Sequence, residues 1–260
     1  FAFINFIIFK MSHFKTVKFD NNKSEFAKVL RKRVNGYFKD KNISKNSNFN
    51  MISKTIFMLS LYFIPFAFIV STNVEMYWLY LTLWAVMGLG MAGIGMSVMH
   101  DANHGSYFKS KKYNDIVGQV ITLIGGSALN WKLQHNVLHH TYTNIPGMDE
   151  DLESDPLMRF SPEQEVKKLH KYQHFYAWFL YGLMTISWSI DKDFSQLVRY
   201  KKKGLLKMQN VNFKKAMIRL IVAKIFYYAY ALVIPMIFAP NWWLALIGYF
   251  TMHFVAGFVL

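Results

Sequence analysis

The sequence contains no cysteine in its 260 residues. The absence of thiols excludes disulfides, thiolate metal sites, iron–sulfur clusters and cysteine nucleophiles, so any metal must be held by histidine, carboxylate or amide groups. Acidic residues are also few, because 15 Asp and Glu stand against 30 Lys and Arg and leave a net charge of +15. A positive charge of this size indicates a polyanionic partner or a face that rests on anionic lipid headgroups.

Charged residues of either sign are scarce, at 17% of the chain, whereas 53% of the residues are hydrophobic and 18% are aromatic. This composition excludes a disordered or fibrous protein. No Lys or Arg occurs between Lys54 and Lys109, and the apolar residues come in long runs. Such runs favour a membrane protein over one or two soluble domains.

Two pairs of apolar runs predict an all-α, polytopic membrane protein with about four transmembrane helices in two hairpins. The first pair is Thr55–Val70 and Met76–Met99, and the second is Ala216–Phe238 and Trp242–Leu260. The run Ile116–Leu129 is short and rich in glycine, so we expect it to be re-entrant or interfacial. Gly88–Gly93 matches a GxGxxG pattern, but its place inside a span indicates helix packing instead of nucleotide binding.

The basic residues decide whether Phe175–Ile190 is a fifth span. Lys and Arg crowd the N-terminal region and residues 109–132 and 192–215, and they avoid both hairpin turns. If Phe175–Ile190 crossed, Lys201–Lys203 would face the opposite side from Lys111 and Lys112. We therefore expect four spans, with the basic segments and a histidine-rich cap on the cytoplasmic side. Arg219 and Lys224, near the start of the third run, are expected to snorkel to the interface.

The two ends of the sequence carry expectations of their own. Residues 1–10 lack the features of a signal peptide, and we expect Met11 to be the natural start and the preceding residues to be an upstream artefact. In residues 11–50, apolar residues at helical spacing predict a cytoplasmic amphipathic helix, which lies on the membrane surface or packs on the body as a solvated helix. Residues 51–260 form the membrane domain. Its last run ends without a cap, so we expect it to be incomplete at the C-terminus.

Five of the nine histidines fall into two clusters, namely His100 and His104 in the first and His135, His139 and His140 in the second. A spacing of four places each pair on one helix face, close enough to share a metal. His140 lies further round the helix, which suits ligands for two metals or a locally unwound turn. Patterned histidines beside membrane spans predict a metal site. The clusters can meet only if Ile116–Leu129 returns to the side where it began.

These motifs, MHDANHGS (Met99–Ser106) and QHNVLHHTYTN (Gln134–Asn144), resemble two histidine boxes of the membrane fatty acid desaturase family, as found in bacterial front-end, linoleoyl-CoA-type acyl desaturases. The resemblance extends from about Met11 to Leu260. It implies a non-haem centre of two iron ions, O2 as oxidant and formation of a cis double bond in a fatty acyl chain. The implied iron ligands are His100, His104, His135, His139 and His140.

The resemblance also implies partners. The acyl substrate is carried on CoA, lipid or carrier protein, and an external ferredoxin or cytochrome b5 supplies electrons, because the sequence has no HPGG haem-binding motif. No third histidine box is present, and in relatives that box follows the last span. Five imidazoles are fewer than such a centre needs in this family, so the 260-residue chain as given is expected to be inactive.

Several residues near the motifs have two interpretations. Asp101, Asn103, Asn136 and Asn144 either orient the imidazole rings or cap helices and form turns. Trp131 lines the acyl channel or anchors the chain at the interface. The acidic stretch Asp149–Asp155 is interpreted as a solvated loop. The alternatives are docking of a cationic donor protein and pairing with the lysine-rich cytoplasmic segments. The remaining histidines near or within apolar runs, His170, His174 and His253, are expected to be structural.

Two alternatives to desaturation stay open. A hydroxylase on the same scaffold could use the same oxidant, and a non-catalytic membrane protein could bind metal through the same histidines. Nucleic acid is not expected as a partner, because a basic rim beside apolar spans is better explained by lipid headgroups or an acyl-CoA phosphate.

Overall fold

The computed structural model describes residue 17 and residues 25–72, 74–152 and 157–260. Every regular element within these residues is a helix, which confirms the predicted all-α class. The prediction for residues 1–10 lies outside the described residues. The α-helices are α1 (Glu25–Asp40), α2 (Phe49–Ser71), α3 (Tyr77–Gly93), α4 (His100–Asn103), α5 (Lys111–Gly118), α6 (Ala128–Trp131), α7 (His140–Tyr142), α8 (Gln173–Ser187), α9 (Asp193–Lys202), α10 (Leu205–Met208), α11 (Phe213–Tyr228), α12 (Ile234–Phe238) and α13 (Trp242–Val259).

Several of these helices are joined end to end by segments of different pitch. The π-helical segments are η2 (Ile94–Met99), η4 (Lys132–His139), η7 (Trp188–Lys192) and η8 (Ala229–Val233). The 3-10 segments are η3 (Gln119–Ile124), η5 (Glu150–Leu152) and η6 (Lys168–Tyr172). Because a π-helix bonds residue i to residue i+5, it has a wider turn than an α-helix and often marks a functional site. Two of the four π segments adjoin or contain the histidine motifs.

Four helical stretches are long and apolar enough to cross a membrane, and they match the four predicted runs: Phe49–Ser71, Tyr77–Asn103, Phe213–Phe238 and Trp242–Val259. Two of them begin earlier than predicted because an asparagine caps each N-terminus. The side chain of Asn48 accepts a hydrogen bond from Met51 N at 3.1 Å, and Asn212 accepts one from Lys215 N at 3.0 Å. Such caps satisfy backbone donors that the first helical turn leaves free.

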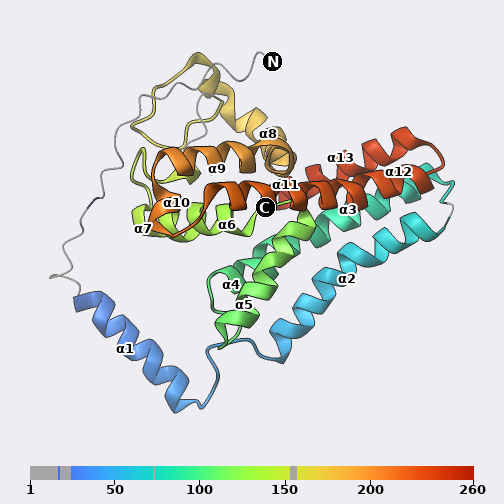
Figure 1. Ribbon diagram of the computed structural model, residues 1–260. Coiled ribbons are helices and arrows are strands. Elements are labelled where there is room, and N and C mark those ends of the chain that lie inside the picture. The colour runs from blue at the N-terminus through green and yellow to red at the C-terminus, as the bar shows by residue number, and fades with distance from the viewer. Residues whose placement is uncertain (1–16, 18–24, 73, 153–156) are drawn as a thin grey trace.

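The spans form one bundle in which α3 packs on both α2 and α13 (Figure 1). Close approach depends on glycine at two positions of α3. A methyl group at Gly88 would lie 2.6 Å from the carbonyl oxygen of Met252 in α13, and one at Gly90 would lie 2.6 Å from the backbone nitrogen of Tyr62 in α2. The GxGxxG pattern therefore serves helix packing, as predicted.

Neither of the two ambiguous runs is among the candidate spans. Ile116–Leu129 is broken into α5, η3 and α6, and Gly125, with φ of +83°, ends η3 in a left-handed turn that glycine adopts without strain. Phe175–Ile190 forms α8 and the start of η7, and α8 packs along α13. The four-span prediction is confirmed for the described residues.

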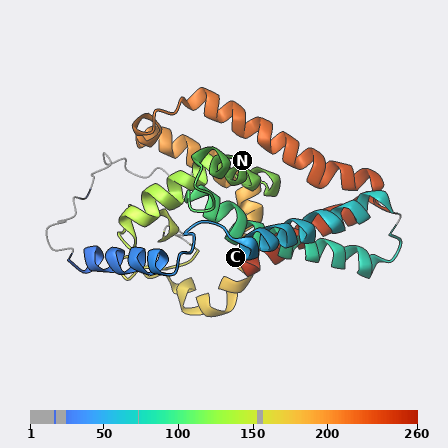
Figure 2. The same ribbon diagram turned by 90° about the horizontal axis from the view of Figure 1, so that it is seen from below.

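A second apolar core lies beyond the bundle and forms a cap. It joins η4, α9, α10 and the start of α11 through buried side chains that include Leu133, Leu138, Leu197 and Leu205. These elements lie at the end of the bundle opposite the two hairpin turns (Figures 1 and 2). The cytoplasmic placement of this cap stays a prediction.

A buried ion pair fastens the cap to the third span. The Lys224 ammonium lies 2.8 Å from Asp193 Oδ2, with side chains 6% and 0% exposed, and it also donates to the carbonyls of Gly125 and Trp188 at 2.6 and 2.9 Å. The Asn130 amide donates to the carbonyl of Asp193 at 2.6 Å. The prediction that Lys224 snorkels to the interface is therefore wrong: the carboxylate and carbonyls inside the fold provide partners that draw the ammonium inward.

Candidate metal centre

The first histidine motif sits where the second span ends. The π-helical segment η2 leads into α4, which ends as Gly105 adopts φ of +73°. The rings of His100 and His104 are 4.5 Å apart between centroids, so the predicted shared face is present. Asp101 Oδ1 lies 3.2 Å from His100 Nδ1, within reach to orient that ring.

The second motif lies on η4, and its wider turn explains why His140 joins the others. In an α-helix, a residue five positions on points well away from the first, whereas a π-helix brings it nearly into line. The ring centroids of His135 and His140 are 4.6 Å apart, closer than the 5.4 Å between His135 and His139. Nε2 of His140 lies 3.2 Å from Nε2 of His135. The π-helical turn of η4 corresponds to the locally unwound turn that was one of the two expectations for the adjacent His139 and His140.

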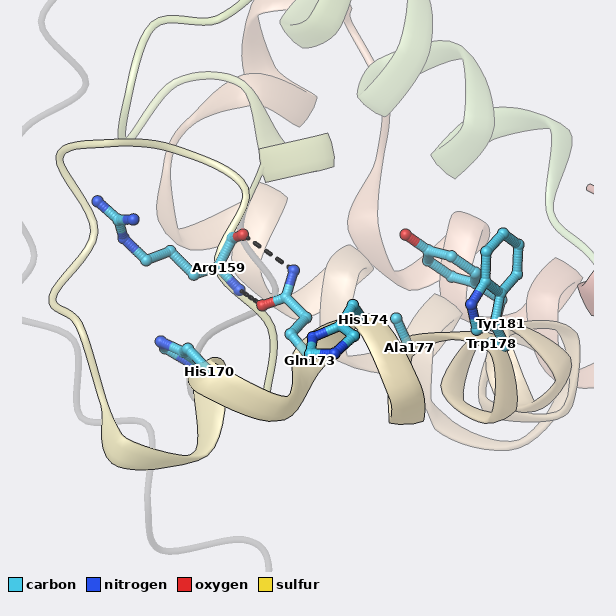
Figure 3. A pocket seen from close by; sticks show the side chains of 7 residues that line it. All are labelled: Arg159, His170, Gln173, His174, Ala177, Trp178 and Tyr181. Atoms are coloured by element: carbon cyan, nitrogen blue, oxygen red, sulfur yellow. Dashed lines mark hydrogen bonds between the residues drawn. The ribbon is translucent and has the colours of Figure 1, made fainter.

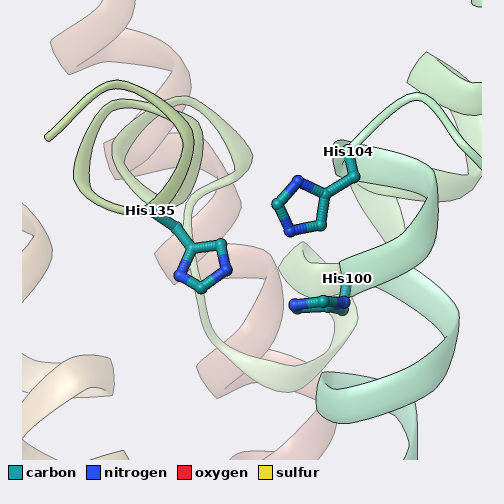
Figure 4. A group of neighbouring side chains, drawn as sticks. All are labelled: His100, His104 and His135. Carbon is teal, nitrogen blue, oxygen red and sulfur yellow. The ribbon is translucent and has the colours of Figure 1, made fainter. Parts of the chain in front are cut away.

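The two motifs meet, as predicted. Ligand atoms of His100, His104 and His135 lie within 4.8 Å of one another, and the three rings point into one space (Figure 4). His140 joins this group with its ring centroid 4.9 Å from that of His104. Because a metal–imidazole nitrogen bond is about 2.0–2.1 Å long, two nitrogens on one ion lie at most about 4.2 Å apart. The three nitrogens are therefore a candidate ligand group that a bound ion would draw slightly closer together.

Two of the predicted supporting asparagines join the motifs directly. The Asn136 amide donates to the backbone carbonyl of Asn103 at 2.9 Å, which ties η4 to α4. Asn103 is buried and its own amide donates to the carbonyl of Gly118 at 3.2 Å, so the intervening segment is held against the first motif. Asn144 acts through its backbone N–H, which donates to Asp149 Oδ2 at 2.9 Å. Their part in metal binding stays a prediction.

Trp131 lies against the imidazoles. Its ring centroid is 4.5 Å from that of His135 and 5.5 Å from those of His100 and His104. The indole thus covers one side of the cluster and limits access of water to it. Its role in an acyl channel stays a prediction.

The surroundings keep the central imidazoles neutral. Burial is the largest of the effects that lower the pKa of His135 to about 4, and the neighbouring rings of His140, His104, His100 and His139 contribute the rest. Burial likewise lowers the pKa of His104, with smaller effects from His100 and His140. A neutral imidazole offers a nitrogen lone pair, whereas a protonated one does not, so both rings are ready to bind a metal at neutral pH.

Two carboxylates of the predicted solvated loop lie beside the second motif. Nδ1 of His139 is 3.0 Å from Asp149 Oδ1 and 3.2 Å from Asp151 Oδ2. The Asp149 side chain is only 1% exposed, so the expectation of a solvated loop is wrong at this position. Gly147, with φ of +77°, lies in the turn that brings Asp149 and Asp151 beside His139. Two features of the sequence could have indicated this arrangement. A Pro-Gly turn follows the histidines, and two aspartates spaced two residues apart follow that turn.

Asp149 is fully engaged by donors. In addition to the His139 ring, it accepts the backbone N–H groups of Asn144 at 2.9 Å and Asp151 at 3.1 Å. Burial by itself would raise the pKa of this carboxyl, but these donors hold it below its ordinary value. A carboxylate at Nδ1 of a histidine fixes the ring orientation and leaves Nε2 for a metal.

Glu150 secures the loop that carries both aspartates. Its side chain is 2% exposed and accepts two hydrogen bonds from Arg199, at 3.0 and 3.1 Å, and one from the Tyr200 hydroxyl at 2.8 Å. Lys203 Nζ lies 3.3 Å away. Burial opposes ionisation, but Arg199, Lys203 and Tyr200 lower the pKa of Glu150 below its ordinary value. The forked contact therefore pins η5 to α9 next to the histidines.

The other histidines of the apolar regions stay outside the cluster. His253 is fully buried in α13, where Nε2 lies 2.7 Å from the Tyr227 hydroxyl and Nδ1 lies 3.0 Å from Thr185 Oγ1. The single proton of Thr185 is donated to the His253 carbonyl, so Nδ1–H donates to Thr185 and Nε2 accepts from Tyr227. With both nitrogens engaged, His253 has the structural role expected of it.

His170 and His174 line a separate cavity of about 500 Å³ together with Arg159 and Trp178 (Figure 3). None of the five motif histidines lines this cavity. The Gln173 side chain bonds both backbone groups of Arg159, at 2.7 and 3.1 Å, and holds the neighbouring loop to α8. The two histidines therefore lie outside the candidate centre.

Comparison with known proteins identifies relatives of the chain. The family model for fatty acid desaturases matches residues 76–260. The chain is 40% identical over 165 residues to an sn-1 linoleoyl-lipid 6-desaturase of Arthrospira platensis, which covers 64% of this chain and 45% of that protein. It is 34% identical over 172 residues to the enzyme of the same name from Synechocystis sp., covering 66% and 47%.

A third relative is an acyl-lipid (8-3)-desaturase of Physcomitrium patens, 36% identical over 179 residues that cover 67% of this chain and 37% of that protein. The chain thus spans about half the length, or less, of these curated relatives. No solved structure matches it.

Proposed function

Because this chain belongs to the fatty acid desaturase family, we propose that it is the part of an O2-dependent fatty acyl desaturase that carries the first two histidine motifs. The protein would introduce a cis double bond into a fatty acyl chain. The observation that carries this proposal is the meeting of imidazoles from two distant segments at one end of a membrane bundle. The relatives' names support a lipid-linked acyl substrate, and the alternatives are acyl groups carried on CoA or on a carrier protein.

The five imidazoles would supply part of the ligand set for a pair of iron ions. His100, His104 and His135, with His140 beside them, would hold one ion, and the adjoining His139 would contribute to the second. Imidazole suits iron, although it also suits zinc, copper and nickel, so the family membership is what favours iron. When bound, the two ions supply the electrons and the O2 activation needed to remove hydrogen from an unactivated methylene group.

The residues of this chain prepare that chemistry. Asp149 accepts the Nδ1 proton of His139 and so would leave Nε2 available to a bound metal. Asp101 is placed to do the same for His100. Trp131 covers one side of the cluster and would limit the access of water to it. The apolar bundle would surround a bound acyl chain. Electrons would come from an external donor of ferredoxin or cytochrome b5 type, on the cytoplasmic side.

The test is to express the complete reading frame in a host that lacks polyunsaturated lipids and to analyse its fatty acids by gas chromatography and mass spectrometry. We expect a new cis-unsaturated acid. His139→Ala should abolish it while the protein stays in the membrane. His174→Ala is the matched control and should retain the product, because that histidine lies outside the centre.

Other products would change the conclusion. A new hydroxy acid would assign the protein to the hydroxylases. No product from an iron-loaded protein supplied with a reduced donor would contradict both activities and favour a non-catalytic metal-binding role. The 260-residue chain, expressed alone, is expected to give no product.

A further inference from the structure

Helix α1 leaves its apolar side chains uncovered. None of its 16 residues is buried, and Phe26, Leu30 and Tyr37 are 80%, 48% and 56% exposed. Large apolar side chains exposed singly are common on proteins, but a contiguous stripe of them marks an interaction surface. The stripe therefore requires an occupant that the described residues do not provide.

The two sides of α1 differ in chemistry, although one basic residue, Arg33, projects from the apolar side. Phe26, Leu30, Val34 and Tyr37 recur at spacings of three and four and share one side. The opposite side carries basic residues, namely Lys28, Arg31, Lys32 and Lys39. A helix with Phe and Leu on one side and Lys and Arg on the other has the composition of helices that lie in the interface of a bilayer.

The chain between α1 and α2 is held close to the bundle. The Asn46 amide donates to the carbonyl of Ser106 at 3.1 Å, and Ser47 N donates to the carbonyl of Tyr107 at 2.8 Å. This fastens the linker to the turn that follows His104, and the first membrane span begins immediately afterwards at Phe49. Helix α1 is thus restricted to the end of the bundle that carries the candidate metal centre.

The orientation of α1 agrees with a position in the membrane plane. In Figure 1, α1 runs crosswise to α2, and in both views it stands clear of the bundle (Figures 1 and 2). A bilayer that α2 crosses would therefore meet α1 along its length.

We propose that α1 is an interfacial helix that binds the surface of a bilayer containing anionic lipid. Its apolar stripe enters the boundary between headgroups and acyl chains, and its basic side contacts lipid phosphates. A bilayer is favoured over a protein partner because α2, eight residues further on, is itself apolar enough to cross one. The proposal does not depend on the metal centre or on catalysis.

The experiment uses the absence of cysteine, which lets one introduced thiol carry a fluorophore. Leu30→Cys and Lys28→Cys place the probe on opposite sides of α1, only two residues apart. Each labelled chain is reconstituted into nanodiscs of phosphatidylcholine with phosphatidylglycerol, and quenching by nitroxide-labelled lipid is measured. We expect quenching at position 30 to exceed that at position 28 by about threefold or more.

The basic side is tested separately with Arg31→Gln/Lys32→Gln in the Leu30→Cys background. We expect quenching to fall in this variant, and to fall also in pure phosphatidylcholine or at high salt. The thermal unfolding midpoint should not change, because no α1 residue is buried. Equal quenching at both probe positions would overturn the proposal. A probe at position 30 that is shielded from aqueous iodide but not quenched by lipid would overturn it too, in favour of a protein partner.

Discussion

Replacing Lys224 by methionine should destabilise the protein strongly, because it leaves a buried carboxylate without compensation. The Asp193 side chain is 0% exposed, and its Oδ2 atom has no hydrogen-bond partner in the described residues apart from the ion pair with Lys224. Breaking a buried pair by removing one partner costs about 3–5 kcal/mol. Little discount for solvent applies, since the Lys224 side chain is itself only 6% exposed.

The cost should be lower when both charges are removed together. In Lys224→Met/Asp193→Asn no uncompensated charge is left, and the remaining amide still offers an acceptor for the neighbouring Asn130 and Trp188 donors. We expect the loss of unfolding free energy in the double variant to be about 2 kcal/mol smaller than the sum of the losses in the two single variants.

The measurement is the free energy of unfolding in nanodiscs, followed by tryptophan fluorescence. Arg219→Met is the matched control, because this cation lies on the same helix but is exposed, and it should change stability by less than about 0.5 kcal/mol. The reasoning is refuted if Lys224→Met costs less than about 1 kcal/mol, or if the two single effects simply add.

Three further predictions concern the surroundings of the centre. The folded-state pKa of Glu150 lies below its ordinary value of 4.5, so its stabilisation is present above that pH and is lost as the pH falls through the folded value. Glu150→Gln should therefore lower the unfolding free energy by about 2 kcal/mol at pH 7 and make this free energy depend less on pH in the acidic range. An unchanged dependence on pH would contradict this. Asp149→Asn should weaken Fe2+ binding about 10–100-fold in an anaerobic titration. Asp151→Asn should have a smaller effect, because the Asp151 side chain is 35% exposed. Equal losses of affinity in the two variants would argue against a role of Asp149 in orienting His139. Gly125→Ala should lower the unfolding midpoint more than Gly147→Ala, because both have positive φ but only at Gly125 would the methyl group collide, 2.8 Å from a tyrosine ring.

The spans and the meeting of the histidine motifs could be predicted from local patterns. An apolar run long enough to cross a bilayer has few structural solutions, because every backbone polar group must be paired within the segment. The charge pattern then required Ile116–Leu129 to return to its starting side, which places His104 and His135 at the same end. The structure brings their ring centroids to 5.1 Å.

The surroundings of the motifs were not predictable in the same way. The sequence predicted that Asp149 and Glu150 belong to a solvated acidic loop and that Lys224 lies near the interface. In the structure all three residues are buried. A charged residue becomes buried only when a partner from elsewhere in the chain compensates its lost hydration. For Glu150 that partner is Arg199, nearly fifty positions later. Pairing of the acidic stretch with the lysine-rich segments was one alternative from the sequence, but no local pattern selects Arg199 as the partner of Glu150.

The amino-acid sequence by itself determined the helical class, the four spans and the five imidazoles, because hydropathy, helical period and residue chemistry are properties of short segments. Tertiary structure decided which groups surround those imidazoles and which turn presents them. The π-helical pitch of η4 places His140 beside His135, and packing of α9 against η5 holds Asp149 at His139. Both outcomes depend on contacts between distant segments, whose energies appear only when those segments meet.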